Sequence, residues 1–336
     1  MGIVVSLDGD RGRKPSLDPL SELVAEDLKA VNELIVQRMD SPVKLIPQLA
    51  GHIIAAGGKR LRPMLTLAAA HMCDYSGSRH VALAACVEFI HTATLLHDDV
   101  VDESTLRRGR DTANTLWGND ASVLTGDFLY SRAFQMMVEL DSFQIMRVLA
   151  DATNRIAEGE VMQLMHSHNP DLAENDYLEV VDRKTASLFA AGCRLAAELA
   201  GCDAARCDAM ATYGRHLGVA FQVIDDSLDY GRGDGNYGKN VGDDLAEGKA
   251  TLPLIRALSQ VEAAVGEPIR RALRDGDRDA LDDVLKAIES TDAMEYTCGR
   301  AEGEADKAVA ALDVFDESPF KATLVSLAEF SVQRRY

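Results

Sequence analysis

An acidic five-residue pattern occurs twice in this chain. Residues 98–102 read Asp-Asp-Val-Val-Asp and residues 225–229 read Asp-Asp-Ser-Leu-Asp, so both have the form D-D-x-x-D. In a helix, the first and last aspartates of each copy are four residues apart and lie on one face. Carboxylates grouped in this way suit a hard divalent cation, and Mg²⁺ typically joins one or two carboxylates to substrate phosphates. The two copies therefore predict a Mg²⁺ site that binds a phosphorylated ligand from two sides.

The residues that flank each copy distinguish it from an ordinary solvated helix face. Acidic side chains on a helix are usually just exposed, and this chain has 54 aspartates and glutamates. Here Leu95 and Leu96 precede the first copy, and Val223 and Ile224 precede the second. These apolar neighbours place both copies near a core, where an unpaired carboxylate is costly and a bound cation removes that cost.

Basic residues accompany glycines in two segments, 56–63 and 231–253, and follow the first acidic copy in a third, 107–109. Glycine lets backbone N–H groups and nearby cations approach an anion. Arginine adds a planar fork that matches phosphate oxygens. We expect a diphosphate to be bound by Lys59, Arg60, Arg62, Arg107, Arg108, Lys239 and Lys249.

Residues 233–240 come one residue short of a P-loop, because Asn240 stands where Ser or Thr is required. A P-loop leaves a strand and opens a helix. This segment follows a helical pattern and leads into more loop, so the sequence does not predict a nucleotide site.

Composition narrows the class of protein. A net charge of −19 excludes nucleic acid as the expected partner and argues against a polybasic membrane anchor. The six cysteines form no C-x-x-C pair, which favours reduced core residues. No run of eighteen apolar residues occurs, so we expect no transmembrane segment. These features predict a cytoplasmic protein.

Helical periodicity runs through the chain from Leu20 onward. Residues 1–18 are polar and aperiodic, and we expect a flexible N-terminal tail there, followed by one helical domain over 19–336. The fold class predicted is an all-α bundle of ten or more helices. Its principal helical blocks are 81–102, 120–138, 141–166, 174–200, 203–230, 252–264, 277–288, 303–313 and 319–334.

These elements, taken together and in order, resemble the trans-isoprenyl (polyprenyl) diphosphate synthase family. Each element alone is a weak signal, but the ordered set is specific and spans most of the chain. The matching elements, besides the two acidic copies, are Gly57–Pro63, Arg107–Gly109, Lys184-Thr185, Phe221-Gln222, Gly238-Lys239 and Gly248–Pro253.

The resemblance implies an isoprenoid synthase-type fold with a central cavity. It also implies the activity of the family. The enzyme would be a prenyltransferase that adds isopentenyl diphosphate head-to-tail to an allylic diphosphate, with farnesyl or geranylgeranyl diphosphate as primer. Three Mg²⁺ ions are implied, two at the first acidic copy and one at the second. The metal ligands would come from Asp98, Asp99, Asp102, Asp225, Asp226 and Asp229.

The resemblance also implies roles for the other matched residues. Asp98, Asp102, Lys184, Thr185, Gln222 and Asp225 would be catalytic, with Thr185 and Gln222 lining the reacting centre. The allylic diphosphate pocket would be completed by Arg107, Lys184, Lys239 and Lys249, and the diphosphate of isopentenyl diphosphate would be bound by Lys59, Arg60 and Arg108. A homodimer packed through long helices is implied as well.

Product length depends on the residues one helical turn before Asp98. Bulky aromatics there would close the pocket, as the resemblance implies for short-chain members, but Ala93 and Thr94 are small. A helix rises about 1.5 Å per residue, so a product longer than ~20 Å passes the whole 87–98 segment. We therefore expect a long-chain all-trans product of about C40–C50, of the kind that supplies the side chains of quinones such as ubiquinone.

Three alternatives are weighed against this hypothesis. A short-chain geranylgeranyl or farnesyl diphosphate synthase would share the same motifs. A terpene cyclase usually has an Asn/Ser/Glu metal motif in place of the second acidic copy. A non-catalytic synthase subunit should lack one acidic copy or the basic segments, and this chain has both.

Overall fold

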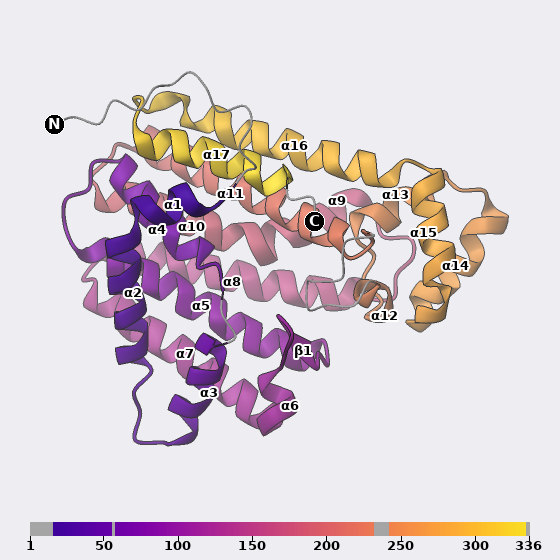
Figure 1. Ribbon diagram of the computed structural model, residues 1–336, viewed down its shortest axis with the longest axis horizontal. Helices are drawn as coiled ribbons and strands as arrows, with labels where there is room; N and C mark the ends of the chain where they lie inside the picture. The colour runs from indigo at the N-terminus through magenta and orange to yellow at the C-terminus, as the bar shows by residue number, and fades with distance from the viewer. Residues whose placement is uncertain (1–15, 56–57, 232–241, 334–336) are drawn as a thin grey trace.

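The computed structural model describes residues 16–55, 58–231 and 242–333, and it is built almost entirely of helices (Figure 1). The all-α prediction is confirmed. The elements are α1 (Asp18–Leu23), α2 (Ala25–Arg38), α3 (Leu45–Ala55), α4 (Leu61–Met72), α5 (Arg79–Val101), β1 (Leu106–Arg107), β2 (Arg110–Asp111), α6 (Ala113–Trp117), α7 (Asn119–Glu139), α8 (Phe143–His166), α9 (Glu174–Val181), the π turn η1 (Asp182–Ala186), α10 (Ser187–Leu199), α11 (Ala204–Leu228), α12 (Asp243–Ala246), α13 (Leu252–Gln260), α14 (Ala263–Asp275), η2 (Arg278–Ala280), α15 (Leu281–Ser290), α16 (Ala293–Ala311), η3 (Leu312–Val314) and α17 (Pro319–Gln333). The tail predicted for 1–18 lies mostly outside the described residues, and α1 begins at Asp18.

Helix α5 runs through the interior of the bundle with α4, α7 and α10 packed against it (Figure 1). It is long and apolar enough to meet the composition test for a membrane span, and in the described residues it is the one helix that does. Two thirds of its apolar window is buried against other helices, as in a core helix. Its carboxyl end carries the first acidic copy, so the core rigidly positions Asp98.

A small β-hairpin interrupts the helices, although no strands were expected. Strands β1 and β2 pair antiparallel with Arg107 opposite Arg110. The two turn residues, Arg108 and Gly109, have φ of 54° and 72°. Positive φ at both positions is the geometry of a type I′ turn, whose twist matches the flanking strands. The short length of the strands explains why alternation in the sequence did not reveal them.

Three predicted helical blocks differ in their bounds. The block 174–200 is divided by η1, and 252–264 ends at Gln260. Helix α14 was missed because Gly266 and Pro268 weaken its pattern, yet it continues to Asp275. Helix α16 begins at Ala293, ten residues before the predicted block. Its buried face is made largely of alanine, so its hydrophobic periodicity is weak.

Candidate active site

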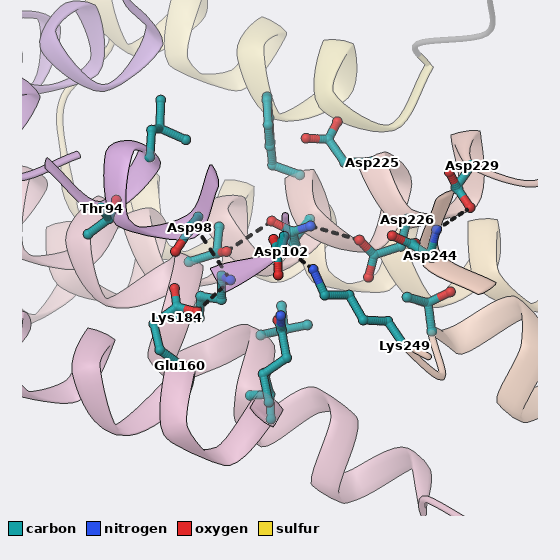
Figure 2. A pocket seen from close by; sticks show the side chains of 18 of the residues that line it. Thr94, Asp98, Asp102, Glu160, Lys184, Asp225, Asp226, Asp229, Asp244 and Lys249 are labelled. Carbon is teal, nitrogen blue, oxygen red and sulfur yellow. Dashed lines mark hydrogen bonds and ion pairs between the residues drawn. The ribbon is translucent and has the colours of Figure 1, made fainter. Parts of the chain in front are cut away.

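A cavity of about 810 Å³ lies where the ends of α5 and α11 face α8, η1 and the hairpin (Figure 2). It collects side chains that are up to 192 positions apart in the sequence, from Lys59 to Thr251. The predicted site residues that line it are Lys59, Arg60, Arg62, Thr94, Asp98, Asp102, Arg107, Arg108, Lys184, Thr185, Gln222, Asp225, Asp226, Asp229 and Lys249. Lys239 lies outside the described residues.

The first acidic copy stands on the last turn of α5, and a lysine meets each of its outer carboxylates. Lys184 Nζ lies 3.6 Å from Asp98 Oδ2 and donates to Glu160 Oε2 at 2.6 Å. Lys249 Nζ lies 2.9 Å from Asp102 Oδ2. Burial would lower the pKa of Lys249, but Asp102 and Glu247 raise it, so its ammonium stays charged. Positive charge is thus held beside both carboxylates.

The middle aspartate of this copy, Asp99, has a different environment. It is buried and does not line the cavity. Its Oδ1 accepts a hydrogen bond from Arg107 Nε at 2.7 Å, and its carbonyl oxygen accepts one from Asn114 Nδ2 at 3.0 Å. Burial raises the pKa of Asp99 despite Arg107. In these contacts Asp99 anchors the hairpin to the end of α5.

The second acidic copy stands on the last turns of α11, on the opposite side of the cavity (Figure 2). Asp225 and Asp229 line the cavity, and Asp229 Oδ2 accepts from the backbone N–H of Asp244 at 3.1 Å. Tyr177 Oη donates to Asp226 Oδ2 at 2.6 Å. Burial, followed by the nearby charge of Asp244, raises the pKa of Asp226 to about 7. Two walls of carboxylates therefore face one space.

The π turn η1 places Lys184 and Thr185 between these walls. A π turn widens the helix by one residue, and such turns are frequent at functional sites. Thr185 Oγ1 donates to Gln222 Oε1 at 2.9 Å, and Gln222 Nε2 donates to Asp226 Oδ1 at 2.7 Å. Helix α8 approaches the turn closely at Gly159, where a Cβ would lie 2.6 Å from the backbone nitrogen of Lys184. The contact needs glycine.

A cluster of guanidinium groups forms another part of the cavity. Arg60 pairs with Glu88 of α5, and Arg62 Nη1 donates to His91 Nε2 at 3.0 Å. Burial lowers the pKa of Arg62 to about 10, so it remains a cation at neutral pH. Burial and the neighbouring arginines lower the pKa of His91, which favours its neutral, accepting form.

Arg108 reaches this cluster from the hairpin turn. A Cβ at Gly58 would lie 2.8 Å from Arg108 Nη1, so a larger residue there would make the guanidinium shift. The left-handed backbone of Arg108 is unusual for a residue other than glycine and costs energy, which is typical of functional positions. The sequence grouped Lys59, Arg60 and Arg108, and the fold brings all three to one cavity.

The lining residues that the sequence did not indicate include Glu160, Tyr177 and Asp244. Glu160 follows the buried stripe of α8, four residues after Ile156, and that spacing was the available signal. Burial raises the pKa of Glu160 to about 7 although Lys184 lowers it. Tyr177 and Asp244 belong to no recognisable pattern.

The two residues predicted to set product length occupy different places. Thr94 lines the cavity, and its Oγ1 donates to the carbonyl oxygen of His91 at 2.8 Å. Ala93 has no exposed surface and belongs to the apolar core. A larger side chain at 94 would therefore enter the cavity, whereas one at 93 would first meet core neighbours.

Known proteins are similar to this chain in sequence along nearly its whole length. The family model for polyprenyl synthetase matches residues 43–291. The octaprenyl diphosphate synthase of Escherichia coli (strain K12) is 49% identical over 320 residues, covering 95% of this chain and 99% of that protein. An all-trans-nonaprenyl-diphosphate synthase (geranyl-diphosphate specific) of Rhodobacter capsulatus is 42% identical, covering 93% of this chain and 96% of that protein.

Solved structures agree with the fold. A polyprenyl synthase from Caulobacter crescentus CB15, crystallised with calcium and isoprenyl diphosphate, superposes with a TM-score of 0.93 at 48% identity, and the match covers 96% of this chain and 99% of that one. A decaprenyl diphosphate synthase from Rhodobacter capsulatus gives a TM-score of 0.90 at 45% identity, over 95% of this chain and 99% of that one.

Proposed function

The chain belongs to the polyprenyl synthetase family and is a trans-prenyltransferase that makes long-chain all-trans polyprenyl diphosphates; from this premise, we propose how its residues divide the reaction. The observation that carries the proposal is the pair of carboxylate walls, Asp98 with Asp102 and Asp225 with Asp229, facing one cavity across lysines and arginines. Carboxylates and cations in one space suit a diphosphate that is bound through a metal.

The allylic diphosphate is assigned to the space between the two acidic helix ends. The donor set there is carboxylate oxygen, which fits Mg²⁺, and we assign three ions to Asp98, Asp102, Asp225 and their neighbours. When bound, Mg²⁺ neutralises charge that develops on the departing diphosphate. Lys184 and Lys249 already lie beside the same carboxylates, so they can turn to the phosphate oxygens without crossing the cavity.

Isopentenyl diphosphate is assigned to the arginine cluster. Lys59, Arg60 and Arg108 converge where Gly58 admits a guanidinium, and forked donors of this kind bind phosphate oxygens in pairs. Arg62 supports the cluster from a partly buried position, with its guanidinium 4.6 Å from the ring centre of Phe189. The two diphosphates therefore have separate anchors on opposite sides of the reacting carbons.

The chemistry needs no protein nucleophile. The C–O bond of the allylic diphosphate breaks, the double bond of isopentenyl diphosphate forms a C–C bond to the allylic carbon, and a proton leaves the adjacent carbon. The released diphosphate accepts that proton. Thr185 and Gln222 line the reacting centre. The hydrogen bonds from Thr185 to Gln222 and from Gln222 to Asp226 fix the orientation of both side chains. Apolar walls such as Leu95 and Phe221 exclude water that would quench the allylic cation.

We further propose that the primer is farnesyl or geranylgeranyl diphosphate. The product is about C40–C50, because the small side chain of Thr94 leaves the cavity open at that position. This product supplies quinone side chains. The test is elongation of farnesyl diphosphate by radiolabelled isopentenyl diphosphate with Mg²⁺, followed by chromatography of the products. Chains of about C40–C50 are expected. Products that stop at C20 would overturn the length assignment, and absence of turnover by the pure protein would revive the non-catalytic subunit.

A homodimer through α7 and α8 is also proposed. Large apolar side chains are exposed along these helices, including Leu124 at 67%, Phe143 at 90% and Met165 at 75%. An exposed apolar set of this size marks an interaction surface, and a second copy can cover it by two-fold pairing. Light scattering should show a dimer that Leu124→Asp dissociates. Val314→Asp, at an exposed apolar position on η3, is the matched control and should remain dimeric.

The cytoplasm is the proposed location. Cys73, Cys86 and Cys193 are buried as thiols without disulfides, as in proteins kept in a reducing compartment. Cell fractionation tests this directly, and recovery of the protein with membranes after a high-salt wash would contradict it.

A further inference from the structure

Three side chains of metal-binding types converge at the end of α5 that is opposite to Asp98. Asp27 lies on α2, His71 on the last turn of α4 and His80 on the first turn of α5. Asp27 Oδ2 lies 2.6 Å from His71 Nε2 and 3.1 Å from His80 Nε2. One donor atom from each residue lies within 4.8 Å of the other two. Three helices thus direct their polar atoms to one point.

The polar atoms of this triad are incompletely satisfied. His80 is only 4% exposed, and its Nδ1 has no hydrogen-bond partner among the described residues, while its Nε2 pairs with Asp27 Oδ2 at 3.1 Å. Buried polar atoms without a partner are costly and call for an explanation such as an ion. The side chains of Asp27 and His71 are 27% and 29% exposed, so the point of convergence is accessible from solvent.

Aromatic contacts hold the two imidazoles in place. The ring of His71 stacks on Phe320 of α17 with centroids 5.0 Å apart, and Tyr75 meets the edge of His80 at 5.4 Å. The two imidazole planes are 80° apart. Fixed rings lose little side-chain entropy when they bind a ligand, so the triad is preorganised.

We propose that Asp27, His71 and His80 form a Zn²⁺ site in which water supplies the fourth ligand. Two imidazole nitrogens and one carboxylate oxygen suit Zn²⁺, whereas Mg²⁺ prefers oxygen alone. In a tetrahedral site with bonds of 2.0–2.1 Å, ligand atoms lie about 3.3 Å apart. The His80–Asp27 separation of 3.1 Å nearly meets this value, and the His71–Asp27 separation of 2.6 Å is about 0.7 Å shorter than it. The three donor atoms lie within 4.8 Å of one another, so small side-chain adjustments would complete the site.

The site is distinct from the catalytic one. His80 precedes Asp98 by 18 residues on the same helix, which is roughly 27 Å. A metal at this position would join α2, α4 and α5, so its role would be to stabilise the fold. The inference does not depend on the residue roles proposed for the cavity.

The test is metal binding to the full chain in excess Mg²⁺, which occupies the carboxylate walls. Co²⁺ in place of Zn²⁺ should give the intense visible bands of a tetrahedral site at one equivalent per chain. His71→Gln, His80→Gln and Asp27→Asn should each weaken Zn²⁺ binding at least about 10-fold, measured by competition with a chromophoric chelator. Zn²⁺ should also raise the thermal midpoint of the wild type and of none of these variants.

His97→Gln is the matched control, because His97 Nε2 also pairs with a carboxylate, that of Asp127 at 3.4 Å. It should keep the wild-type Zn²⁺ affinity. If His80→Gln does not fold, His71→Gln decides the test, because the His71 side chain is 29% exposed and its substitution disturbs the core less. Absence of stoichiometric binding in the wild type, or binding that survives all three triad variants, would overturn the proposal and leave the triad as a hydrogen-bonded contact.

Discussion

A phenylalanine at position 94 should shorten the product sharply. Thr94 lines the cavity four residues before Asp98, which is about 6 Å along α5. One isoprene unit contributes four C–C bonds of about 1.5 Å and therefore extends the chain by roughly 5 Å. A growing chain anchored near Asp98 reaches residue 94 within its first two or three units. The Thr94→Phe ring then blocks further growth, so we expect farnesyl diphosphate to be extended only to about C20.

The assay is elongation of farnesyl diphosphate by the purified variant, with chain length read by reversed-phase chromatography. Thr94→Val is the matched control, because it keeps the branched shape, loses the hydrogen bond to His91 and should leave the product length unchanged. Ala93→Phe should also shorten the product but at a cost of about 1–3 kcal/mol in stability, because it overpacks the core.

The reasoning is refuted if Thr94→Phe folds with the wild-type thermal midpoint and still makes the wild-type distribution of products. That result would mean that the chain leaves the cavity by a route that does not pass residue 94. Shortening by Ala93→Phe with an unchanged midpoint would show instead that position 93 already borders the tunnel.

Four further predictions follow from the charges of the site. Removal of divalent cations by EDTA should abolish turnover and leave the helical circular dichroism intact, and added Mg²⁺ should restore activity; turnover in EDTA would exclude the metal assignment. Asp225→Ala should lower kcat about 10²–10³-fold. It should not lower the thermal midpoint, because the substitution relieves repulsion among crowded negative charges. A decrease in kcat of less than about 10-fold would remove Asp225 from the catalytic residues. Glu160→Gln should lower kcat about 10-fold with little change in KM for isopentenyl diphosphate, because Glu160 orients Lys184, and an effect on KM alone would contradict that role. Burial and Asp244 raise the folded pKa of Asp226 from 3.8 to about 7, so its protonated form is favoured on folding. The thermal midpoint without metal should therefore fall as pH rises from 4 to 8, and Asp226→Asn should make this dependence on pH weaker. The same dependence on pH in the wild type and in Asp226→Asn would refute the prediction.

The sequence motifs predicted most of the site residues, because diphosphate binding restricts which residue types can be used. A diphosphate with its metal requires carboxylates, cations and glycines, and few other side chains can replace them. Asp98, Asp102 and Asp225 were therefore recognisable without coordinates, and all three line the cavity. Glu160 and Tyr177 were missed because each acts on another side chain rather than on the ligand, and such support leaves no spacing in the sequence.

Local structure was predictable where periodicity was strong. The observed bounds of helix α5 agree closely with the bounds predicted from its apolar pattern. Those of α16 do not, because its buried face is mostly alanine, which gives only a weak hydrophobic pattern. The hairpin and the π turn were missed for another reason. Each is only a few residues long, and each is stabilised by contacts from elsewhere, such as Asp99 with Arg107 and Gly159 with Lys184.

By itself, the sequence determined the helical fold class and the chemistry of the site, because helix periodicity and ligand type depend on residue identity. Tertiary structure alone decided that Thr94 enters the cavity while Ala93 stays in the core, and that Asp99 holds the hairpin. It also brought Asp27, His71 and His80 together from three helices. The physical reason is that side-chain direction and long-range proximity depend on how whole helices pack, which no short spacing records.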